Sequence, residues 1–186
     1  MVITIKMSEL KALLLFVPRK DVRYYLNSIC VRVQGDKAQL TASDGATLAC
    51  LQAEHYLKSS EADPGHIEML IPIDVLELAS KQKTMFVDID LVGSTVNQIP
   101  FTPIDSRYPD FVELLDNAFD DCRVDVNGEL LHRVFKAFKM LSEAIAKPKT
   151  NSKCMLFSTN NFLAVIMAYK HRKQDYIEPF KIINLG

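Results

Sequence analysis

Residues 40–49 read Leu-Thr-Ala-Ser-Asp-Gly-Ala-Thr-Leu-Ala. Asp44-Gly45, in the middle of this stretch, is a strong turn signal, and runs typical of strands lie on either side of it at Lys37–Ala42 and Thr47–Glu54. A second turn signal separates the first of these runs from another at Leu26–Gln34. The stretch therefore predicts three consecutive antiparallel strands joined by tight turns.

The chain preceding these strands predicts one more strand and a helix. Val2–Ile5 alternates like a strand, and a helix over Leu10–Val17 begins at Ser8-Glu9 and is ended by Pro18. The resulting order is β-α-β-β-β, and it recurs with openings at residues 2, 67 and 122. Helices gathered on one side of antiparallel strands predict an α+β fold made of three such units.

The second and third units repeat this order with their own turn and cap signals. In the second unit, Val92-Gly93-Ser94 is a hairpin signal, and the expected elements are a strand at Ile67–Ile71, a helix at Ile73–Ser80, and strands at Met85–Leu91, Thr95–Gln98 and Phe101–Ile104. In the third unit, Asn127 is the expected helix cap, and the expected elements are a strand at Cys122–Val126, a helix at Leu130–Ala146, and strands at Cys154–Thr159, Phe162–Tyr169 and Tyr176–Ile183.

Length and composition limit the classes of protein that fit. The 186 residues are 48% hydrophobic and 24% charged, which is typical of a globular domain and excludes disordered and collagen-like chains. The four cysteines lie far apart without a CxxC pair, so reduced thiols in a cytoplasmic protein are expected. No apolar run approaches the ~20 residues of a membrane helix, and no secretory signal is visible.

Charge is divided unevenly along a chain whose formal net charge is -1. Residues 1–126 hold 12 Lys/Arg and 19 Asp/Glu, whereas residues 127–186 hold 10 and 4. In the predicted third helix, His132, Arg133, Lys136 and Lys139 share the arc opposite the apolar one. This pattern suits either an ordinary solvated helix face or a phosphate-facing helix.

Motifs of enzymes and metal sites are missing. The sequence has no phosphate loop, GxGxxG, GxSxG or HExxH motif, and its four histidines are isolated. Asp88 and Asp90 share one face of a predicted strand, which is a solvated face more often than a pair of catalytic carboxylates. We therefore expect a protein that is not an enzyme and that carries no cofactor or metal.

Three separated blocks resemble, in order, the middle domain of the bacterial DNA polymerase III β subunit, the sliding clamp. These blocks are Asp21-Val-Arg-Tyr-Tyr-Leu-Asn-Ser, the stretch 40–49, and Asp105-Ser-Arg-Tyr-Pro-Asp-Phe. The family typically reads D-V-R-Y-Y-L-N-G, A-T-D-G-H-R-L-A and D-G-R-F-P-D-Y. The resemblance implies the DNA-clamp fold, in which two β-α-β-β-β modules form one domain. Residues 1–118 are then one clamp domain, with modules 1–63 and 64–118, and residues 119–186 are half of another.

The resemblance also implies two kinds of contact residue. Those expected to face duplex DNA, without sequence specificity, are Arg19, Lys20, Arg23, Tyr24, Tyr25, Arg133, Lys136 and Lys139. Those expected to line a pocket for partner peptides are Leu26, Ser43, Gly45, Ala46, Thr47, Leu48, Pro109 and Leu114. The chain departs from the family where Ala46-Thr47 replaces His-Arg and Glu113 replaces a basic residue.

These features predict a clamp-like replication and processivity factor. It would assemble with itself, as a dimer or a ring of four copies, and tether a DNA polymerase or another clamp-binding protein to DNA. Self-association through the third unit is expected because half a domain leaves a sheet edge and a buried face without a partner. The alternative is a clamp-derived module or decoy that binds clamp partners, or the clamp itself, without encircling DNA.

Overall fold

The structure is a computed structural model that describes residues 1–35, 37–56, 66–111, 124–142, 148–151 and 153–168. The first unit contains β1 (Val2–Lys6), α1 (Met7–Leu14), the 3-10 helix η1 (Tyr24–Leu26), β2 (Ser28–Gln34), β3 (Lys37–Ser43) and β4 (Thr47–Tyr56). The second contains β5 (His66–Pro72), α2 (Ile73–Ser80), β6 (Phe86–Asp90), β7 (Thr95–Val96) and β8 (Ile99–Pro100). The third contains α4 (Gly128–Leu141), β9 (Lys149–Thr150), β10 (Cys154–Ser158) and β11 (Phe162–Met167).

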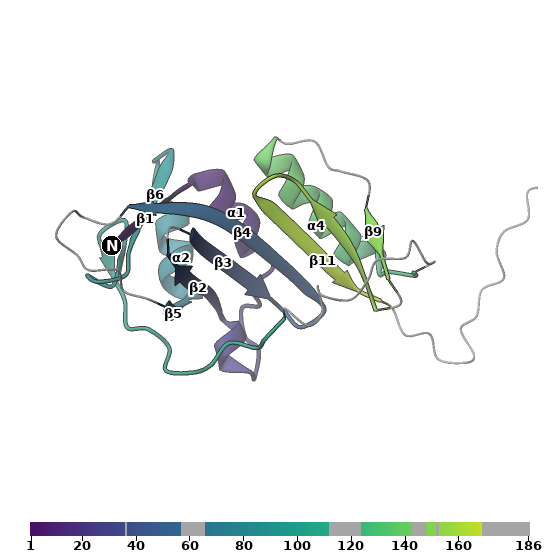
Figure 1. Cartoon of the computed structure of the whole chain (residues 1–186), viewed down its shortest axis with the longest axis horizontal. Coiled ribbons are helices and arrows are strands. Elements are labelled where there is room, and N and C mark those ends of the chain that lie inside the picture. The colour runs from purple at the N-terminus through teal and green to yellow at the C-terminus, as the bar shows by residue number, and fades with distance from the viewer. Residues whose placement is uncertain (36, 57–65, 112–123, 143–147, 152, 169–186) are drawn as a thin grey trace, which may run out of the picture.

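The strands pair antiparallel throughout, and the long strand β4 joins two sheets (Figure 1). One side of β4 pairs with β3, and the order on that side continues through β2 to β5. On its other side, the first half of β4 pairs with β11 and its last two residues pair with β1. The third unit therefore extends the sheet of the first unit.

Hydrogen bonds beyond the strand ladder fasten both ends of β11 to the first unit. At one end the Met167 N–H donates to the Ala46 carbonyl at 2.9 Å, and at the other the Gln52 N–H donates to the Asn161 carbonyl at 2.8 Å. Phe162 also packs against Phe16 of the first unit, with ring centroids 6.4 Å apart. The two units thus share one continuous apolar core.

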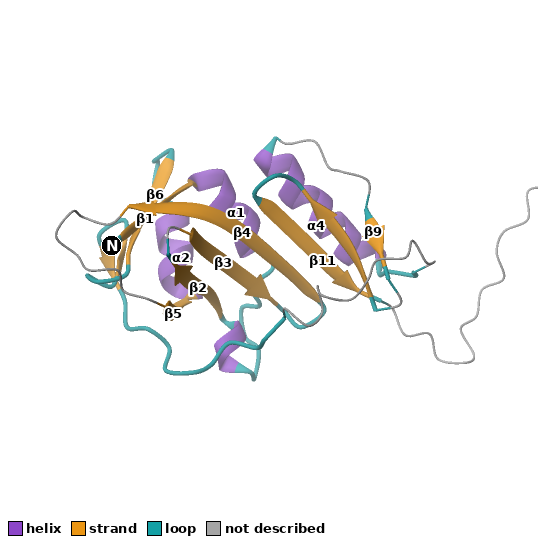
Figure 2. Ribbon diagram, in the orientation of Figure 1, coloured by secondary structure: helices purple, strands orange, loops and turns teal. Residues whose placement is uncertain are grey.

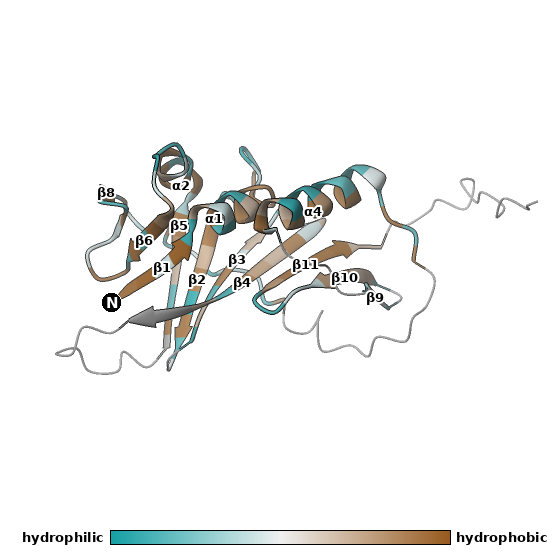
Figure 3. Cartoon of the chain, turned by 90° about the horizontal axis from the view of Figure 1, so that it is seen from above, coloured by the Kyte–Doolittle hydropathy of each residue, from teal (hydrophilic) through white to brown (hydrophobic). Residues whose placement is uncertain are grey.

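Among the described residues, the α-helices lie on one face of the sheets, side by side in the order α2, α1, α4 (Figures 2 and 3). Helix α1 follows β1 directly because the Glu9 carboxylate accepts a hydrogen bond from the Lys6 N–H at 2.7 Å and caps the first turn. The expected Asn127 cap of α4 is confirmed, since its side chain accepts from the Glu129 N–H at 2.8 Å. The α+β architecture with helices on one side is therefore confirmed.

Several predicted boundaries were wrong for local reasons. Leu26 lies in η1 and not in a strand. The predicted strand Thr95–Gln98 ends at Val96, because Asn97 and Gln98 form a turn with left-handed φ angles of 46° and 67°. The next strand is then Ile99–Pro100 and not Phe101–Ile104. Residues 124–126 are not a strand.

The third helix ends at Leu141, where Ser142 takes a left-handed φ of 56°. Other parts of the predicted third unit lie outside the described residues, namely Cys122-Arg123, residues 143–146 of the predicted third helix, and the predicted strand Tyr176–Ile183. Among the described residues, no helix is both long enough and apolar enough to cross a membrane.

Candidate functional site

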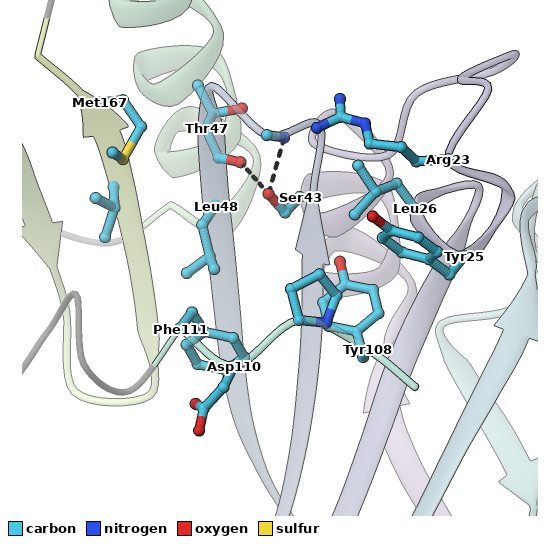
Figure 4. Close-up of a pocket in the computed structure, with 13 residues that line it drawn as sticks. Arg23, Tyr25, Leu26, Ser43, Thr47, Leu48, Tyr108, Asp110, Phe111 and Met167 are labelled. Atoms are coloured by element: carbon cyan, nitrogen blue, oxygen red, sulfur yellow. Dashed lines mark hydrogen bonds between the residues drawn. The ribbon is translucent and has the colours of Figure 1, made fainter. Parts of the chain in front are cut away.

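A pocket of about 220 Å³ lies where the first and third units meet (Figure 4). It is open at the surface between η1, the start of β4, the segment 108–111 and β11. Six of the eight residues predicted for a peptide pocket line it: Leu26, Ser43, Gly45, Thr47, Leu48 and Pro109. Ala46 is not among the lining residues, and Leu114 lies outside the described residues.

Seven further residues line this pocket that were not predicted as part of it: Arg23, Tyr25, Tyr108, Asp110, Phe111, Val165 and Met167. Arg23 and Tyr25 had been expected to face DNA. Val165 and Met167 come from β11, so their place depends on the pairing of β11 with β4, which no local pattern reveals. The walls are mainly apolar, because Leu26, Leu48, Phe111 and Val165 all belong to one buried cluster.

The turn between β3 and β4 forms one rim of the pocket and is held by a dense set of hydrogen bonds. The Ser43 hydroxyl donates to the Thr47 carbonyl at 2.7 Å and accepts from the Gly45 N–H at 3.0 Å (Figure 4). Gly45 has a φ of +86°, and a Cβ there would lie 2.7 Å from an Arg23 guanidinium nitrogen. The turn therefore favours glycine for its left-handed backbone conformation, and a Cβ there would also have to displace the Arg23 guanidinium.

The Asp44 carboxylate is the centre of this turn. One oxygen accepts from the Ala46 N–H at 2.9 Å, the Thr47 N–H at 2.7 Å and the Thr47 hydroxyl at 2.9 Å. The other Asp44 oxygen accepts a hydrogen bond from the guanidinium of Arg133 on α4. The same guanidinium also donates to the Thr47 hydroxyl at 3.3 Å. Burial alone would raise the pKa of Asp44, but the Arg133 guanidinium and these N–H groups outweigh it and lower that pKa. Helix α4 of the third unit is thus tied to the rim of the pocket.

The opposite wall is a connector, residues 101–111, held against β2 and β5. Arg32 and Glu68 pair across these strands at 2.8 Å, and the second Glu68 oxygen accepts from the Tyr108 N–H at 3.2 Å. The Arg32 guanidinium also lies over the Phe111 ring, 5.4 Å from its centroid. One ion pair therefore positions both Tyr108 and Phe111.

The residues predicted to face DNA do not form a single row of free cations. Lys136 and Lys139 are exposed on α4, and Lys20 is exposed after α1. Arg19 is exposed but pairs with Glu77 at 3.2 Å, whereas Arg23 pairs with Asp21 at 2.7 Å. The remaining three are the Asp44-bound Arg133 and the adjacent Tyr24 and Tyr25, whose rings meet edge-on at 6.0 Å.

The described cysteines and carboxylates form no second chemical site. Burial raises the pKa of the Cys30 thiol to about 12 and that of Cys50 to about 11, which keeps both thiols protonated and unreactive. Within the described ranges, no group of three or more His, Cys, Asp or Glu side chains could hold a metal ion. The main feature of the site is the apolar pocket.

Solved structures similar to this chain include bacterial sliding clamps. The Helicobacter pylori beta clamp, solved with a bound DNA ligase peptide, matches with a TM-score of 0.70 at 11% identity over 91% of this chain and 66% of that chain. The DNA polymerase III beta subunit of Thermotoga maritima matches with a TM-score of 0.65 at 15% identity over 94% and 66%. A DNA polymerase sliding clamp from Pseudomonas aeruginosa gives 0.63 at 14% over 91% and 67%.

No protein-family model and no curated protein sequence matches the chain. The similarity therefore rests on the three-dimensional structure, and the chain spans about two thirds of the length of these clamps. It has the DNA-clamp fold, as its three sequence blocks predicted.

Proposed function

We propose that this chain, whose fold is that of the bacterial DNA polymerase III beta clamps, is a non-enzymatic, clamp-like replication protein. In this proposal several copies assemble around duplex DNA in the cytoplasm and tether a polymerase or another partner protein to it. Residues 1–118 act as one clamp domain, and residues 119–186 as half of a second.

The observation that carries this proposal is the pocket between the first and third units. Its volume, about 220 Å³, is below the ~300–1,000 Å³ of typical small-molecule sites. It suits one or two apolar side chains of a peptide and not a whole cofactor. Its apolar walls with a few polar rim groups match the way short peptide segments anchor in preformed grooves. The Helicobacter pylori clamp has a DNA ligase peptide bound, and we propose a peptide of a DNA-metabolising protein as the ligand here.

The DNA-binding part of the proposal relies on the helical face. Lys136 and Lys139 are exposed on the outer side of α4, and Lys20 is exposed beyond α1. Contacts from such lysines to phosphates are independent of sequence and weaken with salt, as a sliding protein requires. Self-assembly through the third unit is supported by its edge strand β9, which pairs only with β10 among the described strands.

The second candidate is a decoy that binds clamp partners without encircling DNA. The specific observation in its favour is that three of the predicted DNA-facing arginines are paired with acids: Arg19 with Glu77, Arg23 with Asp21 and Arg133 with Asp44. Each pair removes a free positive charge that a phosphate contact would need.

One experiment separates the two candidates. A long duplex with blocked ends is immobilised, the protein is added at low salt, and the labelled DNA ligase peptide follows. A tethering protein binds the duplex and then retains the peptide on it. A decoy binds the peptide in solution but does not bind the duplex, and that result would overturn the tethering function.

A further inference from the structure

The hydroxyl of Tyr108 is an unusual polar group in the pocket. The Tyr108 ring lines the pocket and is 1% exposed, yet its hydroxyl oxygen is fully buried and has no hydrogen-bond partner within the described part of the chain. Figure 4 draws this hydroxyl end on the side of Ser43 and Leu26, among the lining residues. A buried hydroxyl without a partner opposes folding, so its presence calls for another role.

The unpaired Tyr108 hydroxyl can act as a hydrogen-bond donor. Burial raises the pKa of Tyr108 well above its ordinary value, so the hydroxyl keeps its proton at neutral pH. A protonated hydroxyl can donate a hydrogen bond, and no described group accepts one from it. The proton therefore has no acceptor among the described residues, and a peptide oxygen can accept it where peptide binding displaces the side chains that cover the hydroxyl.

The hydroxyl is not required to fill space. In the motif that residues 105–111 resemble, the position of Tyr108 is phenylalanine, so the ring alone can occupy it. The ring is already fixed through its backbone, whose N–H donates to Glu68 at 3.2 Å. This preorganised ring carries its hydroxyl in one orientation, which lowers the entropy cost of a hydrogen bond to a ligand.

We propose that Tyr108 is a specificity-determining residue of this pocket: its hydroxyl donates a hydrogen bond to an acceptor oxygen of the bound peptide. The acceptor is a carbonyl or side-chain amide oxygen close to the apolar side chain that fills the pocket. Peptides that have only hydrocarbon groups near the Tyr108 hydroxyl leave it unpaired and bind less well. This inference rests on the proposed peptide-binding function.

The test uses the full chain and Tyr108→Phe, which removes only the hydroxyl, with the DNA ligase peptide of the Helicobacter pylori complex as the probe. Thr102→Val is the matched control, because it also removes a hydroxyl from the connector but from an exposed residue outside the pocket. Peptide affinity is measured by calorimetry, and the melting temperature of each free protein is measured in parallel.

Tyr108→Phe should bind the peptide about 3- to 10-fold more weakly, as expected for one lost hydrogen bond, while its free form melts at the same or a higher temperature. Thr102→Val should bind like the original chain. Equal or tighter binding by Tyr108→Phe would overturn this inference and leave the proposed function standing. If the original chain does not bind the peptide, the proposed peptide site and this inference both fail.

Discussion

Replacing Arg133 by methionine should lower the free energy of unfolding, because it releases α4 from the rim of the pocket. Arg133 is the cation that reaches Asp44 and the Thr47 hydroxyl across the junction of the two units. Methionine keeps an unbranched apolar stem and helix propensity, so the substitution removes mainly the charge and its hydrogen bonds.

The size of the effect follows from the exposure of the pair. The side chains of Arg133 and Asp44 are 32% and 17% exposed, so the pair is neither at the surface nor fully buried. Exposed pairs contribute about 0.2–1 kcal/mol, and breaking a buried pair costs about 3–5 kcal/mol. In the variant, Asp44 still accepts hydrogen bonds from the Ala46 and Thr47 N–H groups and from the Thr47 hydroxyl, so its buried charge keeps three hydrogen-bond donors. We therefore expect a loss of about 2 kcal/mol, close to one charge-assisted hydrogen bond.

Urea denaturation at neutral pH measures this loss, and calorimetry should show a melting temperature lower by about 4–8 °C for a chain of this size. Lys136→Met is the matched control, because it removes a cation from an exposed position one turn along the same helix and should change stability by less than about 0.5 kcal/mol. Equal stability of the two variants would refute the assigned role of Arg133.

The effect should also depend on pH in a defined direction. The pKa of Asp44 is lowered in the folded chain, so the stabilisation from its carboxylate is complete above its ordinary value of 3.8 and is lost as pH falls through the lowered pKa. The difference between the original chain and Arg133→Met should therefore shrink below about pH 4. A difference that stays constant from pH 7 to pH 3 would mean that Arg133 stabilises the chain by packing alone.

Three further results are expected. Lys136→Ala with Lys139→Ala should weaken binding to duplex DNA and lower the slope of log affinity against log salt by about 2, measured by fluorescence anisotropy; an unchanged slope would exclude both lysines from phosphate contacts. Gly45→Ala should cost about 1–3 kcal/mol in urea denaturation, because its φ of +86° is left-handed and the new Cβ would lie 2.7 Å from Arg23; a neutral effect would contradict the described turn. Cys30, with a pKa raised to about 12, should react with iodoacetamide only after denaturation, and rapid labelling of the folded chain would show that it is not buried.

Local features of the fold could be predicted from the sequence. Asp44-Gly45 marks its turn because aspartate caps the following N–H groups and glycine accepts a positive φ, and helix α2 begins and ends at Ile73 and Ser80 as predicted. The resemblance to clamps placed Leu26 and Leu48 at a pocket, and both line it. These predictions depend on residues that are neighbours in the chain or belong to quoted motifs.

Features that depend on distant pairing could not be predicted. Periodicity identifies β11 as a strand but does not say that it pairs with β4, so Val165 and Met167 were missed as pocket residues. The helical arc showed Arg133 on the polar side of α4, but its partner Asp44 lies 89 positions earlier in the chain. The backbone of Tyr108 is similarly held by Glu68, which is 40 positions away.

The central proposal is that several copies of this chain enclose duplex DNA. The most direct measurement compares retention on a closed circular plasmid with retention on the same plasmid cut once, by gel filtration at a salt concentration that removes ordinary phosphate contacts. We predict that the protein elutes with the circle and is released when the circle is cut. Equal retention on the two forms, or no retention on either, would contradict a protein that encircles DNA.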